Sequence, residues 1–461
     1  MLAMALGGCA LGPAPGSYSD PEIAFPEEWS EHGSGDASYE LASYWQALGD
    51  PVLTELVDQA IANNLDIVQA GTRLVQAREG LSQARASLLP SLAATGGASR
   101  AVGDGASNDI TSNLGLNANW ELDLFGRIGS SAQAARFDYE SAGYSLADLQ
   151  RVIAGQVALQ VISARSTMLQ LEIARSSLAI QEDNLQIAQW RNQAGLVSSL
   201  DVEQARSQRA QTAASIPLLE SSYAATANAI STLIGEPPGR VRALLAEFQP
   251  LPDPPQLGEL GAPVDLLRRR PDIRQSEARL YSDAARIGVA RAQLFPLLTL
   301  SGNLGTNDAG PLNLFDLVTG SIAASVNQLL FDGGQTTSRI RSAEAAADGS
   351  FAGWQSTILS ALEEAENAIA SRRSAEDRIG DIAESLDAAT NAALIARSQY
   401  QAGLTDFQTL LTTESQLLTA RNSMVSAQAD RASAFIRLTQ ALGGGWAIAE
   451  WEETLANGNT P

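Results

Sequence analysis

Cysteine and histidine are almost absent from this sequence. Its 461 residues include one cysteine, Cys9, and one histidine, His32. A single thiol excludes an internal disulfide, and a zinc site of cysteine and histidine would lack ligands, which leaves only carboxylates for calcium or magnesium. The HExxH, GxSxG, P-loop and CxxC patterns are missing as well. We therefore expect no catalytic residue, no cofactor and no metal site.

Basic residues, aromatic residues and long apolar runs are also scarce. The chain has 30 Lys and Arg against 52 Asp and Glu, a formal net charge of -22 and a pI near 4.4. This balance excludes nucleic acid as a partner, because phosphate binding needs a basic surface. Only 5% of the residues are aromatic, so the Ala-, Ser- and Gln-rich segments favour elongated, closely packed helices over a thick core. No apolar run reaches the length of about 18 residues that a transmembrane helix needs.

The first residues have the pattern of a bacterial lipoprotein signal. A short apolar run is followed by two glycines and Cys9, which matches the lipobox, where the signal is cut before a cysteine that is then acylated. No Lys or Arg precedes the run, unlike ordinary export signals, and an unmodified thiol is the alternative. We expect residues 1–8 to be a signal-peptide remnant and residues 9–50 to be an extended segment anchored to a membrane through Cys9.

An internal sequence repeat covers most of the chain. Residues 64–67 align with residues 270–273 at an offset of 206 positions. Two inserted residues then raise the offset to 208, at which the sequence Gln-Ala-Gly-Leu at 193–196 recurs at 401–404. The repeat is too long for a solenoid unit and indicates the tandem duplication of one structural half. The predicted domains are a first repeat, 51–234, a Pro-rich linker, 235–263, a second repeat, 264–442, and a C-terminal tail, 443–461.

Each half is expected to contain the same elements in the same order. A helix ends at a proline, two short strands follow, and the longest helix leads to the Gln-Ala-Gly-Leu turn and a return helix. At about 1.5 Å per residue, the longest helix is a rod of about 100 Å. Pro217 lies inside the first return helix and should kink or break it. The expected helices are 51–89, 127–193 and a return helix ending at 234 in the first half, and about 264–295, 334–401 and a return helix ending at 442 in the second.

The strands alternate apolar and polar side chains. In the stretch 113–125, leucines and a tryptophan occupy one face and asparagines and acids the other. Strict alternation over about 11 residues is typical of a transmembrane β-strand, although a half-buried soluble sheet has the same period. Four strands are too few to close a membrane barrel, and an open edge in hydrocarbon leaves backbone groups unpaired at a cost of several kcal/mol each. Because two copies would supply about eight strands and three copies about twelve, the strands indicate an oligomer.

Three segments carry a resemblance to a known family. They are YWQALGDPVLTELVDQAIANNLDI at 44–67, RRRPDIRQSEARLYSDAARIGVARAQLFPLLTLSGNLG at 268–305 and QLLFDGGQ at 328–335. Through them the sequence resembles the outer membrane factor family of TolC-like efflux channels, and within it the NodT-type lipoprotein branch. The resemblance implies a mostly α-helical chain with a membrane β-barrel, in which a homotrimer forms a twelve-stranded barrel in the bacterial outer membrane that continues as a long helical barrel in the periplasm.

The resemblance also implies partners and a function. Such a channel is a passive duct without catalysis that conducts drugs or other small molecules. An inner-membrane RND-type transporter supplies the energy, and a periplasmic adaptor protein links it to the duct. An equatorial band would be formed by the linker and by the tail after Gly443, including Trp446 and Trp451.

The hairpin tips match the family's adaptor-docking positions. Two glycines would supply the conformational freedom that each reversal of the chain needs, and two copies of the turn would give a trimer six similar tips. The residues implied in docking are Ala194, Gly195, Leu196, Ala402, Gly403 and Leu404.

The closed periplasmic gate is the least defined site. Family members commonly carry an acidic residue six or nine positions after the second tip glycine, where this sequence has threonines; its acids are Asp201 and Asp406. These carboxylates either gate the mouth, with arginines as partners in the closed state, or cap the return helices. The gate candidates are Asp201, Arg206, Arg209, Asp406, Thr409 and Thr412.

Two other interpretations compete with the efflux channel. A periplasmic coiled-coil structural lipoprotein would need the four alternating strands to be soluble. The exit duct of a type I protein-secretion system would share the channel architecture. The Arg-Pro-Asp-Ile signature at 270–273 favours small-molecule efflux.

Overall fold

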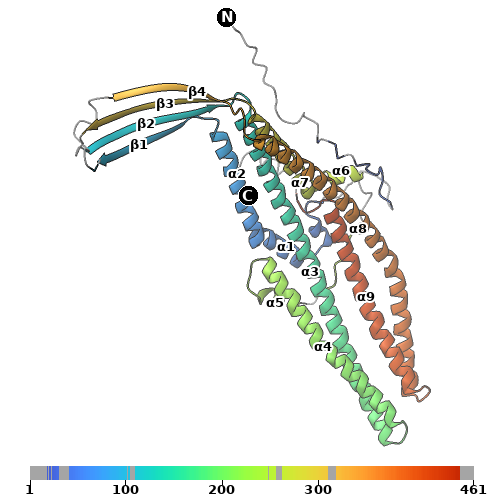
Figure 1. Cartoon of the computed structure of the whole chain (residues 1–461). Helices are drawn as coiled ribbons and strands as arrows, with labels where there is room; N and C mark the ends of the chain where they lie inside the picture. The colour runs from blue at the N-terminus through green and yellow to red at the C-terminus, as the bar shows by residue number, and fades with distance from the viewer. Residues whose placement is uncertain are drawn as a thin grey trace.

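A curved β-sheet forms one end of the molecule, and two long helical hairpins extend to the other end (Figure 1). The computed structural model describes residues 18, 20–21, 23–30, 41–100, 102–103, 110–247, 249–255, 262–309 and 318–446. Cys9, His32 and Trp451, for which the sequence makes predictions, lie outside the described residues.

The helices repeat in the two halves of the chain as the duplication predicts. The rods α3 and α8 are 67 residues long each, and α3 has the predicted bounds. Each rod packs along a shorter return helix, α4 or α9, to form a hairpin (Figure 1). The first half contains η1 (Tyr44–Leu48), α1 (Pro51–Asn63), α2 (Leu65–Ala86), α3 (Arg127–Gln193), α4 (Ser199–Leu233) and α5 (Arg240–Leu244), and the second contains α6 (Pro263–Leu267), α7 (Pro271–Ala292), α8 (Gln335–Gln401) and α9 (Phe407–Ala441).

The opening helix of each half is divided, which differs from the single helices predicted at 51–89 and 264–295. Asn64 ends α1 and begins α2, because its Oδ1 accepts hydrogen bonds from the backbone N–H groups of Asp66 (2.9 Å) and Ile67 (3.1 Å). In the second half α6 and α7 are separate, and Pro271 occupies the first position of α7. The divided helices therefore reflect local capping chemistry inside a helix-favouring stretch.

The return helix α4 runs through Pro217 without a break. Proline removes one backbone hydrogen bond, so the expected interruption had a sound cause. Two ion pairs bind α4 to α3 on either side of the proline: Arg209 with Glu182, and Glu220 with Arg175, both at 2.6 Å. Packing against the neighbouring rod keeps α4 helical across Pro217.

The sheet has four antiparallel strands in sequence order, β1 (Ser91–Arg100), β2 (Ile110–Leu122), β3 (Leu297–Ala309) and β4 (Val318–Asn327). The second strand ends earlier than the predicted stretch to residue 125. Asp123 instead binds the first turn of α3, because its carboxylate accepts hydrogen bonds from the N–H groups of Ile128 (3.0 Å) and Gly129 (2.6 Å). Asp332 does the same for α8 at Gly334 and Thr336.

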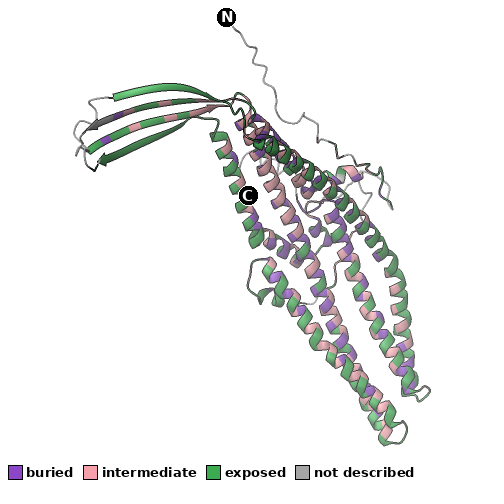
Figure 2. Cartoon of the chain, in the orientation of Figure 1, coloured by how far each residue is buried: buried purple, intermediate pink, exposed green. Residues whose placement is uncertain are grey.

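The main hydrophobic core lies at mid-height, around the middle of α3, where buried residues concentrate (Figure 2). Trp446 is buried there and meets Tyr144 edge-on, with ring centroids 6.4 Å apart. Arg165 binds the linker and the start of α1 together, through Gln249 (2.6 Å) and Asp50 (2.5 Å). Among the described helices, α3 contains a window apolar enough by composition to cross a membrane, but 56% of that window is buried within the chain, as in a core helix.

The described residues between 18 and 30, here called the strap, follow α8 away from the sheet. The Tyr18 hydroxyl donates to Asp348 (3.1 Å), Gln355 donates to the carbonyl of Pro21 (2.9 Å), and the backbone N–H of Ser30 donates to Glu366 (3.1 Å). The strap therefore descends along one face of α8.

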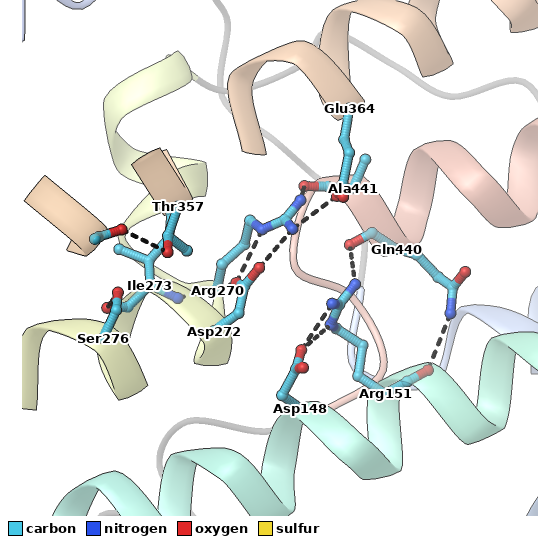
Figure 3. Close-up of polar contacts among 11 residues, drawn as sticks. Asp148, Arg151, Arg270, Asp272, Ile273, Ser276, Thr357, Glu364, Gln440 and Ala441 are labelled. Atoms are coloured by element: carbon cyan, nitrogen blue, oxygen red, sulfur yellow. Dashed lines mark hydrogen bonds and ion pairs between the residues drawn. The ribbon is translucent and has the colours of Figure 1, made fainter. Parts of the chain in front are cut away.

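Equivalent residues of the two halves hold the ends of the return helices. The Asn64 side chain donates to the carbonyl of Leu233, the last residue of α4 (2.8 Å), and Arg270, its equivalent in the repeat, donates to the carbonyl of Ala441, the last residue of α9 (2.9 Å). Arg270 is almost fully buried and also binds Asp272 and Glu364, both at 2.7 Å (Figure 3). One arginine thus joins α7, α8 and α9.

Charge pairing at this junction shifts the pKa of Asp272. Burial opposes ionisation of the carboxyl group, but the hydrogen bonds and charge of Arg270 outweigh burial and hold the pKa of Asp272 below its usual range. The stability that the carboxylate contributes is complete above the pKa of an unfolded Asp, about 4, and is lost as the pH falls through the lowered folded value.

Replacement of Arg270 should lower the folding stability of the chain. The variant Arg270→Gln leaves the partly buried carboxylate of Asp272 without its ion-pair partner and the carbonyl of Ala441 without its donor, which should lower stability by about 3 kcal/mol. The neighbouring exposed Arg269 offers a matched control, Arg269→Gln. Thermal melting followed by circular dichroism measures both; equal melting temperatures would contradict the assigned role.

Candidate channel wall and hairpin tips

The sheet separates apolar from polar side chains, as the alternation predicts. The strand register places Leu116 opposite Leu304, Trp120 opposite Leu300 and Leu298 opposite Val326, all on one face. Both faces of the sheet are largely exposed within one chain (Figure 2), and Ile322 on the apolar face is 84% exposed. Such a surface is unfavourable in water and favourable in lipid.

The other face of the sheet is polar and locally neutral. Asn117 lies opposite Asn303, and their side chains take part in hydrogen bonds that cross neighbouring strands, to Thr95 (3.2 Å) and from Ser321 (2.9 Å). The acid Glu121 at the helical end is paired with Arg127 at 2.7 Å. This face can line water without a strong local charge.

The two outer strands have free edges. Among the described residues, β1 pairs only with β2 and β4 only with β3. Their outward backbone groups can bond to water or to another strand, but lipid offers neither partner. The sheet is therefore incomplete as a membrane structure.

The two hairpin turns adopt the same backbone conformation. Gly195 and Gly403 have φ values of 72° and 74°, a left-handed region that other residues rarely adopt. In each turn the N–H after the glycine bonds to a carbonyl five residues earlier, Leu196 to Arg191 and Leu404 to Gln399, both at 2.8 Å. The repeated sequence Gln-Ala-Gly-Leu therefore forms the same helix C-cap in both halves. All six predicted docking residues, 194–196 and 402–404, lie exposed at these tips.

The side chains around the two turns differ. Near the first turn Trp190, which is 60% exposed, and Leu200 project from the hairpin surface. The equivalent positions in the second half are polar, Ser398 and Gln408. The two tips therefore have the same backbone conformation but different side chains on their surfaces.

The two hairpins contact each other just above the tips. Ala188 and Ala205 of the first hairpin form a buried cluster with Tyr400, Phe407 and Leu410 of the second. Across this contact Arg191 lies over the Tyr400 ring, 4.4 Å from its centroid, and donates to the carbonyl of Gln401 (3.2 Å). Sequence reasoning missed these residues, although aromatic residues close to the second turn were a visible signal.

The predicted gate acids cap helices within the chain. Asp201 and Ser198 exchange hydrogen bonds of 3.1 and 3.3 Å at the start of α4. Asp406 accepts from the backbone N–H of Thr409 (2.7 Å), and hydrogen bonding to Thr409 lowers the pKa of Asp406. The hydroxyl of Thr412 donates to the carbonyl of Gln408 (2.9 Å).

The predicted arginine partners pair with other acids. Arg206 binds Glu203 on its own helix and Arg209 binds Glu182 on α3, both at 2.6 Å. Within one chain neither contacts Asp201, so contacts between chains would have to supply the expected gate. Among the described residues, no three His, Cys, Asp or Glu side chains gather as a metal site would require.

The chain matches one protein family along both halves. The family described as "Outer membrane efflux protein" matches residues 56–236 and 262–444. The pyoverdine export outer membrane protein OpmQ of Pseudomonas aeruginosa is 32% identical, over 96% of this chain and 95% of its own. Nodulation protein T of Rhizobium leguminosarum bv. trifolii is 29% identical over the same shares, 96% and 95%. The solved structure of the outer-membrane channel OprN superimposes with a TM-score of 0.84 at 30% identity, covering 95% of this chain and 100% of its own.

These matches confirm the resemblance that the sequence carries, and they agree with the mostly helical, four-stranded fold. The chain therefore belongs to the outer membrane efflux protein family, and it is a non-enzymatic efflux channel component of the bacterial outer membrane.

Proposed function

We propose that three copies of this chain form the exit duct of a tripartite efflux pump. Two observations support this proposal: the free edges of β1 and β4, and the exposed apolar face of the sheet. Pairing β4 of each copy with β1 of the next closes a barrel and satisfies the free backbone groups. A barrel of about eight strands is filled by its own side chains, so a dimer would leave no passage, whereas three copies enclose a wider lumen.

The helical hairpins continue the duct below the barrel. Arranged around the same axis, three copies of each hairpin form a second tube that ends at six tips. A periplasmic adaptor binds these tips, and an inner-membrane RND-type transporter supplies the energy. The transported molecules are small, since pyoverdine export is the task named for the relative OpmQ, and this favours efflux over protein secretion.

Acylation of Cys9 would fix the duct to the inner leaflet of the outer membrane. Asp348, which holds Tyr18 of the strap, lies 13 residues after the start of α8, and this is about 20 Å of helix. The nine residues from Cys9 to Tyr18 span up to about 30 Å when extended. A lipid on Cys9 can therefore reach the membrane while the strap stays bound to α8.

In the closed state, the mouth is held by the contact between the two hairpins of each copy. Arg191 and Tyr400 join the hairpins near the tips, and the apolar cluster beside them excludes water. Opening requires the hairpins to separate at this contact. The assignment of Asp201 and Asp406 to the gate stays a prediction, because it depends on contacts between copies.

A charge on the apolar face of β4 should prevent insertion, whereas a charge on the polar face should not. Ile322→Arg places a guanidinium in lipid at a cost of about 2–4 kcal/mol per copy. Ala323→Arg, one residue away, projects to the opposite face and is the control. Heat-modifiable trimers in outer-membrane fractions are the measurement. The barrel is refuted if Ile322→Arg assembles as well as the control.

Removal of the Arg191 contact should make the closed duct leak. Arg191→Ala loses the cation–π contact and the hydrogen bond, about 1–2 kcal/mol per copy. This loss raises the separated fraction of the hairpin pair in each copy roughly tenfold. Single-channel conductance and sensitivity to a large antibiotic report the change. Arg206→Ala is the control, because the one ion pair of Arg206 within the described part of the chain is with Glu203 on its own helix. Equal leakage in both variants would favour the Asp201 gate instead.

Bulky residues at the two tip glycines should abolish efflux without preventing assembly. In Gly195→Val/Gly403→Val the valines cannot adopt the left-handed turn, so both tips lose their shape. Gly380→Val, at an open position within α8, is the control for the larger side chain. Antibiotic resistance in cells that carry adaptor and pump is scored beside trimer yield. Normal resistance in the double variant would remove the docking assignment.

A further inference from the structure

An apolar collar surrounds the joints between strands and helices. It consists of Leu88 and Leu89 before β1, and of Leu330 and Phe331 after β4; the last two are 90% and 88% exposed. Trp120 lies on the apolar face of the sheet near this level, and its indole N–H donates to the carbonyl of Leu88 (2.9 Å). The collar continues the lipid-facing surface toward the periplasm, to the depth at which lipid headgroups begin.

Arginines lie directly below the collar. Arg85 is in the last turn of α2, and Arg341 lies six residues into α8, about 9 Å from its start. Both side chains are exposed, and neither has an ion-pair or hydrogen-bond partner among the described residues.

The internal repeat shows that Arg85 has lost a partner. Its equivalent in the second half, Arg291, is paired with Glu344 at 2.8 Å. The two rods correspond at an offset of 208 positions, from Arg127 to Gln335, so the residue of the first half that corresponds to Glu344 is Arg136, which pairs with Glu140 at 2.9 Å. The guanidinium at this position is therefore paired with an acid in the second half, at Arg291, and has no acidic partner among the described residues in the first half, at Arg85.

The strap identifies the face to which these arginines belong. Arg341 and Glu344 precede Asp348, which holds Tyr18 of the strap, by seven and four residues, so all three lie on one face of α8. A strap that leads to a membrane anchor must lie outside the tube, so this face is the outer one. Arg85, as the repeat equivalent of Arg291, shares the outer face.

Closure of the barrel brings the two free arginines together. Because β4 of one copy pairs with β1 of the next, the joint after β4 lies beside the joint before β1 of the neighbour. Arg341 of one copy and Arg85 of the next then meet at each junction, below a shared apolar collar. Two like charges at one junction favour a bound anion, and the collar favours one that carries hydrocarbon chains.

We propose that each junction between copies binds one phospholipid of the inner leaflet of the outer membrane. Its phosphate lies between Arg341 of one copy and Arg85 of the next, and its acyl chains cover the collar. The inference rests on the proposed trimer. The lipid closes the outer groove between protomers, and its phosphate offsets one of the two facing positive charges.

Native mass spectrometry of the purified, full-length trimer with added phosphatidylglycerol tests this site. The trimer should retain about one lipid per junction, and Arg85→Gln/Arg341→Gln should weaken retention roughly thirtyfold while trimers persist. Arg85→Lys/Arg341→Lys keeps the charges and should retain most of the lipid. Arg269→Gln, which removes an exposed arginine away from the collar, is the control and should retain as much lipid as the unmodified chain.

Four results would overturn the site. Undiminished lipid retention in the double Gln variant would remove the arginines from it. Protection of the trimer against heat by inorganic phosphate as strongly as by the lipid would show a phosphate site without a lipid. Dissociation of Arg85→Gln trimers in lipid-free detergent would show that Arg85 pairs with an acid of the next copy. Absence of trimers in the unmodified chain would contradict the proposed duct itself, and with it this site.

Discussion

Backbone groups cannot remain unpaired in hydrocarbon, and this constraint shapes the whole molecule. The chain supplies four strands with one apolar face and two free edges, a fragment that is stable in a membrane only when other copies complete it. The ring of copies that closes the sheet also sets the radius at which the rods descend. The sheet thus determines the assembly, and the assembly makes the rods into a tube.

The duplicated chain is fixed at mid-height by two equivalent contacts. Asn64 and Arg270 bind the last carbonyls of the two return helices, and each return helix ends at a left-handed glycine, Gly235 or Gly443. The second half has replaced a neutral amide by a buried arginine that also binds Asp272 and Glu364. Beyond these contacts the hairpins are held mainly by each other, so a movement of the tips can occur without disturbing the barrel.

Features encoded by periodicity could be predicted from the sequence, and features encoded by contacts between distant residues could not. Alternation gave the strands and their faces, and the repeated turn gave rods with the observed bounds. The break at Asn64 was missed because an asparagine cap inside a helical stretch has no periodic signal. The contact of Arg191 with Tyr400 was missed because it joins residues about 200 positions apart in sequence. At Pro217 the break, one of the two predicted outcomes, is absent, since α4 packs on α3 and stays helical through the proline.

The unequal surfaces of the two tips have a consequence for symmetry. Trp190 and Leu200 flank the first turn, whereas Ser398 and Gln408 occupy the same places at the second. A threefold ring of such chains has six tips with one backbone shape but two alternating chemistries. Six identical partner subunits around this mouth would occupy two distinct environments. Three would contact first-half tips and three would contact second-half tips, in alternation, so the ring would have threefold and not sixfold symmetry.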